Sequence, residues 1–222
     1  ALIADTGAGL FFLTKPWKGK LVGSKFFMGI GAFNMVRSYA YRAIGEHRNI
    51  KVQVIDDVFL GKLIKEKGFH QECMLGESLV TLPWYHTLPQ MIDGLMKNVY
   101  AFFHYRPSYV MMGIAAIVAV IVVPMAGVIF ADGVAQLFFI LAVLIRVGGV
   151  GVGMIRIGLS PASILLLLVT PFISLFIITK AVAGVHRAGG VVWRGSFYRL
   201  DMLRKAEWVL SGLFWPVTPK KK

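Results

Sequence analysis

The apolar stretches between residues 109 and 183 constrain the possible folds of this chain more than any other feature. Tyr109–Phe130 carries no charged residue, and Pro161–Ala183 carries only Lys180, near its end, where a long side chain can reach the membrane surface. A helix needs about 20 apolar residues to cross the hydrocarbon core of a bilayer, which is roughly 30 Å thick. The sequence therefore predicts an integral membrane protein in which these two stretches cross the bilayer.

The segment between them, Gly133–Leu159, allows several structures. It is long enough to cross, but it contains Arg146, Arg156 and six glycines. A third span, a broken helix and a re-entrant hairpin are all compatible with this composition. Arginines inside apolar sequence are functional candidates by default, although an interfacial loop explains them equally well. We favour a path that makes no full crossing, so that two crossings separate the two polar parts of the chain.

The formal net charge of +13 comes mainly from residues that flank the apolar stretches. From Gly184 onward, eight basic and two acidic residues give a net charge of +6. Basic residues beside membrane segments attract anionic headgroups and tend to stay on the cytoplasmic side. This distribution argues against a nucleic-acid partner, because binding of nucleic acid calls for a basic face on a soluble domain.

Residues 1–107 mix charged and apolar positions as a globular domain does. Alternation at Lys51–Ile55 predicts a half-buried strand, and the apolar spacing from Phe59 predicts a helix that stops at Gly68. The other expected elements are a helix at Tyr39–Gly45, strands at Phe69–Leu75 and Ser78–Leu82, and an amphipathic helix at Leu88–Tyr105 that lies in the membrane interface.

Asp56 and Asp57 fall at the junction of the predicted strand and helix. Ligands of open α/β sheets bind beyond the carboxyl ends of the strands, and a carboxylate placed there can accept a proton from a hydroxyl group. The alternative is a plain helix N-cap, for which aspartate is a favoured residue. We expect no metal site within this chain, because Cys73 is the single cysteine and the five histidines lack close ligand spacing.

Three motifs, Gly29–Arg37, Val54–Gly61 and Gly68-Phe69, resemble those of membrane-bound family 2 glycosyltransferases of the ceramide-glucosyltransferase-like and hopanoid or carotenoid type. The resemblance implies an α/β fold, the acceptor half of a GT-A domain, joined to an all-α transmembrane region. On this reading residues 1–107 form that half domain, 108–185 form two or three transmembrane helices, and 186–222 form a basic interfacial tail. The chain would be the C-terminal part of a longer enzyme.

The resemblance also implies an activity. The complete enzyme would transfer a sugar, with inversion, from a nucleotide-sugar donor such as UDP-glucose to a membrane lipid, with Asp57 as general base and Asp56 as its neighbour. Mg²⁺ or Mn²⁺ would neutralise the leaving diphosphate, held by an Asp-x-Asp motif upstream of this chain. The catalytic part would face the cytoplasm at the inner or plasma membrane, and this chain alone would be inactive.

Further residues acquire expected roles from the same family. Gly31, Ala32 and Asn34 would line the pocket, and Arg37 could bind sugar or phosphate. Many relatives carry a Gln-x-x-Arg-Trp motif, of which this chain keeps Gln90 but has Asp93 and Gly94 in place of Arg and Trp. The remaining expected substrate-binding residues are Trp84, which follows Pro83 where an arginine is frequent, and Lys97, which could contact the diphosphate or form a helical ion pair with Asp93.

The stretch Val191–Tyr198 resembles the Trp-Arg-Gly-x-x-Tyr end of these enzymes, but an aromatic belt with an interfacial arginine explains it equally well.

Two alternatives to a lipid-directed enzyme stay open. A processive polysaccharide synthase would keep Gln-x-x-Arg-Trp and have more spans. A non-catalytic membrane scaffold or transporter component would need no nucleotide-binding half.

Overall fold

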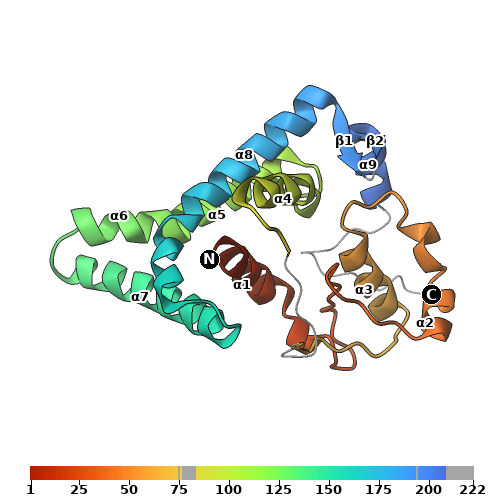
Figure 1. Cartoon of the computed structure of the whole chain (residues 1–222), viewed down its shortest axis with the longest axis horizontal. Coiled ribbons are helices and arrows are strands. Elements are labelled where there is room, and N and C mark those ends of the chain that lie inside the picture. The colour runs from red at the N-terminus through yellow and green to blue at the C-terminus, as the bar shows by residue number, and fades with distance from the viewer. Residues whose placement is uncertain (75, 77–83, 194, 209–222) are drawn as a thin grey trace. The chain divides into compact units, whose positions relative to one another are not determined.

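The computed structural model describes the chain except residues 75, 77–83, 194 and 209–222 (Figure 1). The chain divides into two compact units. We call Ala1–Leu10 with Arg106–Val182 the membrane unit, and Phe11–Tyr105 with Ala183–Lys222 the polar unit. Helix α1, Leu2–Thr14, begins in the first unit and ends in the second.

The first predicted span is confirmed as a helical segment, Pro107–Phe130, with a mean hydropathy of 2.7. It consists of α5 (Pro107–Ile117), a π-helical turn η3 (Val118–Val122) and α6 (Val123–Phe130). The π turn ends two residues before Pro124, whose missing N–H interrupts the α-helical hydrogen-bond pattern.

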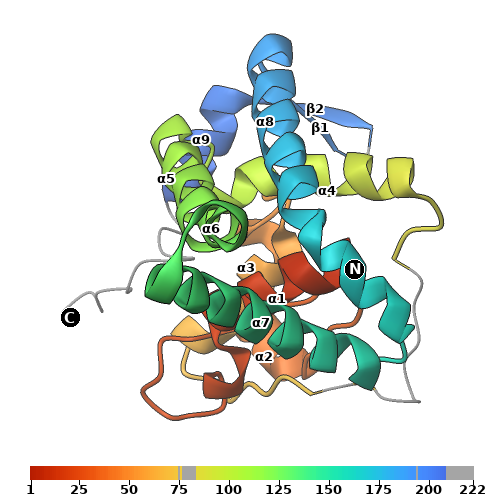
Figure 2. The ribbon, with the colours of Figure 1, turned by 90° about the vertical axis from the view of Figure 1, so that its left-hand side faces the viewer.

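Gly133–Arg156 forms one uninterrupted helix, α7, so the broken-helix and hairpin alternatives are wrong. Its glycines weaken helix propensity by about 1 kcal/mol each. An apolar surrounding outweighs this cost, because every backbone polar group must then bond within its own segment. Helices α6 and α7 lie side by side (Figures 1 and 2), and the ring of Phe139 sits where a side chain at Gly127 would point, 2.2 Å from the Cβ position.

The third candidate span begins later than the sequence predicts. Pro161–Leu168 is a 3-10 helix, η4, and the α-helix α8 runs from Thr170 to Ala188 with a mean hydropathy of 1.2. Among the residues that the structure describes, three helices are thus long and apolar enough to cross a membrane, which supports a membrane protein. Arg146 lies within α7 and pairs with Asp5 of α1, whereas Arg156 is exposed in the last turn of α7.

The polar unit brings together residues that precede and follow the candidate spans. The Tyr100 hydroxyl lies 2.9 Å from Nε2 of His186, and the Arg204 Nε–H donates to the carbonyl of Tyr105 at 3.0 Å. Residues that precede and residues that follow the candidate spans in the sequence therefore belong to one compact unit.

The polar unit is largely helical among its described residues. Its short helices are η1 (Pro16–Lys18), α2 (Ser38–Ala43) and η2 (Glu46–Asn49), and its longer ones are α3 (Asp56–Glu66), α4 (Leu88–Phe102) and α9 (Leu200–Trp208). An antiparallel hairpin joins β1 (Gly190–Trp193) to β2 (Ser196–Arg199), and β1 packs against α4 and α9. The core includes Phe27, Ile44, Ile50, Val54, Phe59 and Leu60.

The expected helices at 39–45 and 59–68 are confirmed, but the expected strand at 51–55 is wrong, because that segment forms turns. The alternation in sequence has no counterpart in burial: Gln53, the presumed outward residue, is as buried as Val54. Residues 69–74 are not a strand either, and the predicted strand Ser78–Leu82 lies outside the described residues. The α/β half domain is therefore not confirmed.

The helix predicted at Leu88–Tyr105 is confirmed as α4, which stops at Phe102 and not at Tyr105, whereas its location in the membrane interface stays a prediction. His104 and Tyr105 adopt positive φ angles of 54° and 50°, a conformation that no α-helix can continue. The turn between α4 and α5 therefore lies where the chain passes from the polar unit into the membrane unit.

Candidate functional site

The two acidic residues of the first turn of α3 have different surroundings. Oδ1 of Asp56 accepts the backbone N–H of Asp57 at 3.0 Å, so Asp56 serves the start of the helix. Asp57 instead turns toward the glycine-rich segment: its Oδ2 lies 3.0 Å from the position that a Cβ at Gly31 would take. Gly31 and Asp57, which the sequence analysis assigns to one site, thus lie side by side.

Glycine is required where this segment meets α3. A Cβ at Gly29 would lie 1.8 Å from the carbonyl oxygen of Asp57, and a Cβ at Gly61 would lie 2.1 Å from the carbonyl oxygen of Met28. Two backbones approach each other here more closely than any side chain would permit. The segment consequently lies on α3 in one position and holds Gly31 beside the Asp57 carboxylate.

Burial raises the pKa of Asp57 above its ordinary value of 3.8, and the neighbouring charge of Asp56 adds to the rise. Backbone N–H groups of Val58 and Gly31 oppose this rise by stabilising the charged carboxylate. The side chain is half-buried, so a ligand can still reach it. A carboxylate with a raised pKa binds a proton more readily, which suits a general base.

Gln71 fastens this arrangement and was missed by sequence reasoning. Its amide oxygen accepts the Met28 N–H at 3.0 Å, and its amide nitrogen donates to the carbonyls of Met28 at 2.8 Å and Gly61 at 3.2 Å. One side chain thus supplies the hydrogen bonds that a neighbouring strand would have supplied. The available signal was the position of Gln71 in the predicted strand Phe69–Leu75, where this polar residue falls on the same side as the apolar Phe69 and Leu75.

The other residues of the glycine-rich motif have local roles. Oδ1 of Asn34 accepts the N–H of Ile30 at 3.1 Å, which closes the turn that carries Gly31. Ala32 is half-buried, and Arg37 is exposed at the start of α2. Asn34 therefore shapes the loop around the site, and Arg37 extends into solvent.

The predicted substrate residues around α4 have separate surroundings. Oε1 of Gln90 accepts the backbone N–H of His86 at 3.3 Å. The backbone N–H of Gln90 donates to the Thr87 hydroxyl at 3.3 Å, so Gln90 takes part in capping the N-terminus of α4. Trp84 is half-exposed. Lys97 and Asp93 are both exposed, and the described part of the chain records no ion pair between them.

Gly94, one of the two residues that depart from the Gln-x-x-Arg-Trp motif, lies beneath the ring of Tyr85. A Cβ at Gly94 would lie 2.3 Å from Cε1 of that ring. Burial against the helix raises the pKa of Tyr85. The tyrosine thus occupies the space into which a residue at position 94 would project, a relation that the spacing of the motif does not reveal.

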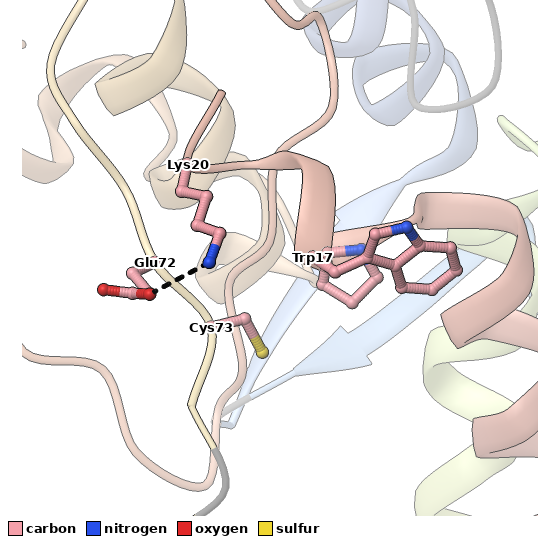
Figure 3. Close-up of a pocket in the computed structure, with 5 residues that line it drawn as sticks. Trp17, Lys20, Glu72 and Cys73 are labelled. Carbon is pink, nitrogen blue, oxygen red and sulfur yellow. Dashed lines mark ion pairs between the residues drawn. The ribbon is translucent and has the colours of Figure 1, made fainter. Parts of the chain in front are cut away.

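A small cavity of about 90 Å³ lies away from these residues and is lined by Pro16, Trp17, Lys20, Glu72 and Cys73 (Figure 3). Lys20 and Glu72 face each other across it at 3.8 Å, with both side chains about half exposed. Pockets for small molecules usually measure about 300–1,000 Å³. This cavity is too small for a nucleotide sugar.

Among the described residues, no group of three or more His, Cys, Asp or Glu side chains lies close enough together to hold a metal ion. Comparison with known proteins gives no further guide: no family model, no curated protein and no solved structure matches the chain.

Proposed function

We propose that this chain is the acceptor-binding and membrane part of an inverting glycosyltransferase that acts on a membrane lipid, with Asp57 as general base. The observation that carries the proposal is the contact between two motifs that lie apart in the sequence, Gly31 of the glycine-rich segment and Asp57 of α3. The raised pKa and partial exposure of Asp57 are the properties that proton removal from a hydroxyl group requires.

In the proposed reaction an acceptor hydroxyl oxygen attacks the anomeric carbon of the donor sugar. Asp57 takes the hydroxyl proton as the new carbon–oxygen bond forms, and the nucleotide diphosphate departs with the electron pair of the broken bond. Attack from the face opposite the leaving group inverts the anomeric centre. Asp56, whose carboxylate accepts the backbone N–H of Asp57, supports the first turn of α3.

Mg²⁺ or Mn²⁺ would supply positive charge beside the diphosphate when bound. The described residues of this chain do not form a set of ligands for it, so we assign it no residue here. The donor-binding residues would belong to the upstream half that the resemblance implies.

Three observations favour a lipid over a soluble acceptor. The chain carries three helices apolar enough to cross a membrane, α4 is an amphipathic helix directly before the first of them, and Phe33 and Met35 of the glycine-rich motif are exposed. The catalytic part would face the cytoplasm of the inner or plasma membrane, where nucleotide sugars are available. Against a processive synthase, the ring of Tyr85 over Gly94 replaces the tryptophan of Gln-x-x-Arg-Trp.

The test uses the complete enzyme, in which this chain follows its nucleotide-binding half, reconstituted in lipid nanodiscs. Asp57→Asn should lower transfer from labelled UDP-glucose to lipid by roughly 10²–10⁴-fold while donor affinity is kept. Asp201→Asn, at an exposed position of α9, is the matched control and should leave transfer unchanged.

Near-normal transfer by Asp57→Asn would contradict the proposal, as would an equal loss of donor binding, which indicates a structural cap. If the region upstream of this chain encodes no nucleotide-binding half, a non-catalytic scaffold becomes the better description. Sugar transfer by this chain alone would contradict the division of labour that we propose.

A further inference from the structure

The segment Phe11–Phe26, which we call the basic aromatic segment, belongs to the polar unit and plays no part in the proposed catalysis. It contains four lysines and no acidic residue. Its exposed apolar side chains include Val22, which is 99% exposed, and Phe12, which is 69% exposed. Phe11, Trp17 and Leu21 are each 42–51% exposed.

Contacts within the polar unit hold this segment in one conformation. The rings of Phe11 and Trp17 lie 4.9 Å apart, and Phe12 meets Trp17 edge-on at 6.4 Å. Nζ of Lys65, on α3, donates to the carbonyl of Gly19 at 2.5 Å and to that of Leu21 at 2.9 Å. The exposed tip at Leu21 and Val22 is therefore built on the same helix that carries Asp57.

Two lysines of the segment lie over one of its aromatic rings. Nζ of Lys15 and of Lys18 lie 5.3 Å and 5.6 Å from the centre of the Phe26 ring. Lys20 is partly balanced by Glu72 at 3.8 Å. The ammonium group of Lys65 donates to the two backbone carbonyls, so this lysine does not contribute to the charge that the segment presents to a binding partner.

We propose that the basic aromatic segment binds the surface of an anionic bilayer. Isolated exposed apolar residues are ordinary on protein surfaces, but aromatic and aliphatic side chains among lysines, with no acidic residue, are typical of segments that lie at the membrane interface. Anionic headgroups would attract the lysines, and Val22, Leu21 and Phe12 would enter the boundary between headgroups and acyl chains. The bilayer is at hand because the same chain carries the candidate spans.

The proposal does not depend on glycosyl transfer. It describes how the polar unit is held against the membrane, in addition to the covalent links at its ends. In the complete enzyme this contact would fix the position of α3, and with it Asp57, relative to lipid headgroups, because Lys65 ties the segment to that helix.

The experiment uses the full chain in nanodiscs, with Cys73→Ser as background. A fluorophore is attached to Val22→Cys, a position without packing contacts to lose, and in a matched control to Arg48→Cys, an exposed site in η2 of the same unit. Lipids with a quencher near the headgroup should quench the probe at position 22 in discs that contain phosphatidylglycerol, and much less the probe at position 48.

In discs of phosphatidylcholine alone, or after Lys15→Glu with Lys18→Glu, the quenching at position 22 should be lost. Equal quenching at positions 22 and 48 in anionic discs would overturn the proposal. Quenching at position 22 that is the same in both lipids and survives the charge reversal would overturn recognition of the anionic surface. Circular dichroism of each labelled variant verifies that it is folded.

Discussion

Replacement of Asp5 by asparagine should destabilise the membrane unit through Arg146. Oδ2 of Asp5 accepts the Arg146 Nη2–H at 2.6 Å and also the hydroxyl of Thr170, and Arg146 donates to the carbonyl of Leu167 at 3.0 Å. The side chains of Asp5 and Arg146 are only 11% and 17% exposed. The pair joins α1 to the middle of α7 and to the start of α8, all within one unit.

The expected size of the effect follows from this burial. Removal of one partner from a buried ion pair typically costs about 3–5 kcal/mol, because the other charge stays buried without compensation. An arginine at the centre of a membrane helix costs about 2.5–3.5 kcal/mol by insertion measurements. We therefore expect Asp5→Asn to lower the free energy of unfolding by about 3 kcal/mol, which is roughly a hundredfold change in the equilibrium constant.

Equilibrium unfolding of the full chain in mixed micelles, followed by circular dichroism, measures this change. The double variant Asp5→Asn/Arg146→Gln should recover part of the loss, because it leaves no unpaired charge. Asp201→Asn is the control, since Asp201 pairs with Arg199 at the surface, where both side chains are more than half exposed, and no measurable loss is expected. The reasoning would be refuted if the loss of the double variant equalled the sum of the losses of Asp5→Asn and Arg146→Gln. It would also be refuted if Asp5→Asn and Asp201→Asn lowered the free energy of unfolding equally.

Three further predictions concern the site and the topology. Gly29→Ala should destabilise the polar unit by about 1–3 kcal/mol or more, because its Cβ would lie 1.8 Å from a backbone oxygen, whereas Gly31→Ala, 3.0 Å from a movable carboxylate, should cost less in the same unfolding assay; equal losses would contradict this. Because the pKa of Asp57 is raised in the folded state, the contribution of this group to stability is fully present below its ordinary value of 3.8 and is lost as pH rises through the folded-state pKa. Asp57→Asn should therefore gain stability relative to wild type as pH rises; a gain that instead grows toward acid would contradict this. A cysteine at Ser196 should resist an impermeant reagent applied outside intact cells, since an even number of crossings separates it from the cytoplasmic part that we propose; modification from outside would establish an odd number.

Local patterns in the sequence determined several elements without help from tertiary structure. The uncharged stretch that ends at Phe130 forms a helix because no other backbone conformation bonds all its polar groups internally. The apolar spacing of α3 and the positive φ of Gly68, 79°, agree with the predicted start and stop. The family resemblance assigned Gly31 and Asp57 to one site, but the close approach of the two residues is seen only in the structure.

Tertiary structure decided what depends on partners distant in the chain. The backbone N–H and carbonyl of Met28 form hydrogen bonds with the side chain of Gln71, where in a sheet they would bond to a neighbouring strand. The alternation of residues in a sequence does not reveal such a partner. The ring of Tyr85 over Gly94 likewise arises from packing.

The contact between the two ends of the candidate membrane region was also beyond the sequence. Hydropathy identifies the candidate spans, and only the contact of Tyr100 with His186 shows that both ends of this region belong to one compact unit. Hydropathy measures the tendency of one segment to leave water, whereas a contact between distant segments is a property of the whole chain, because it depends on what each segment packs against.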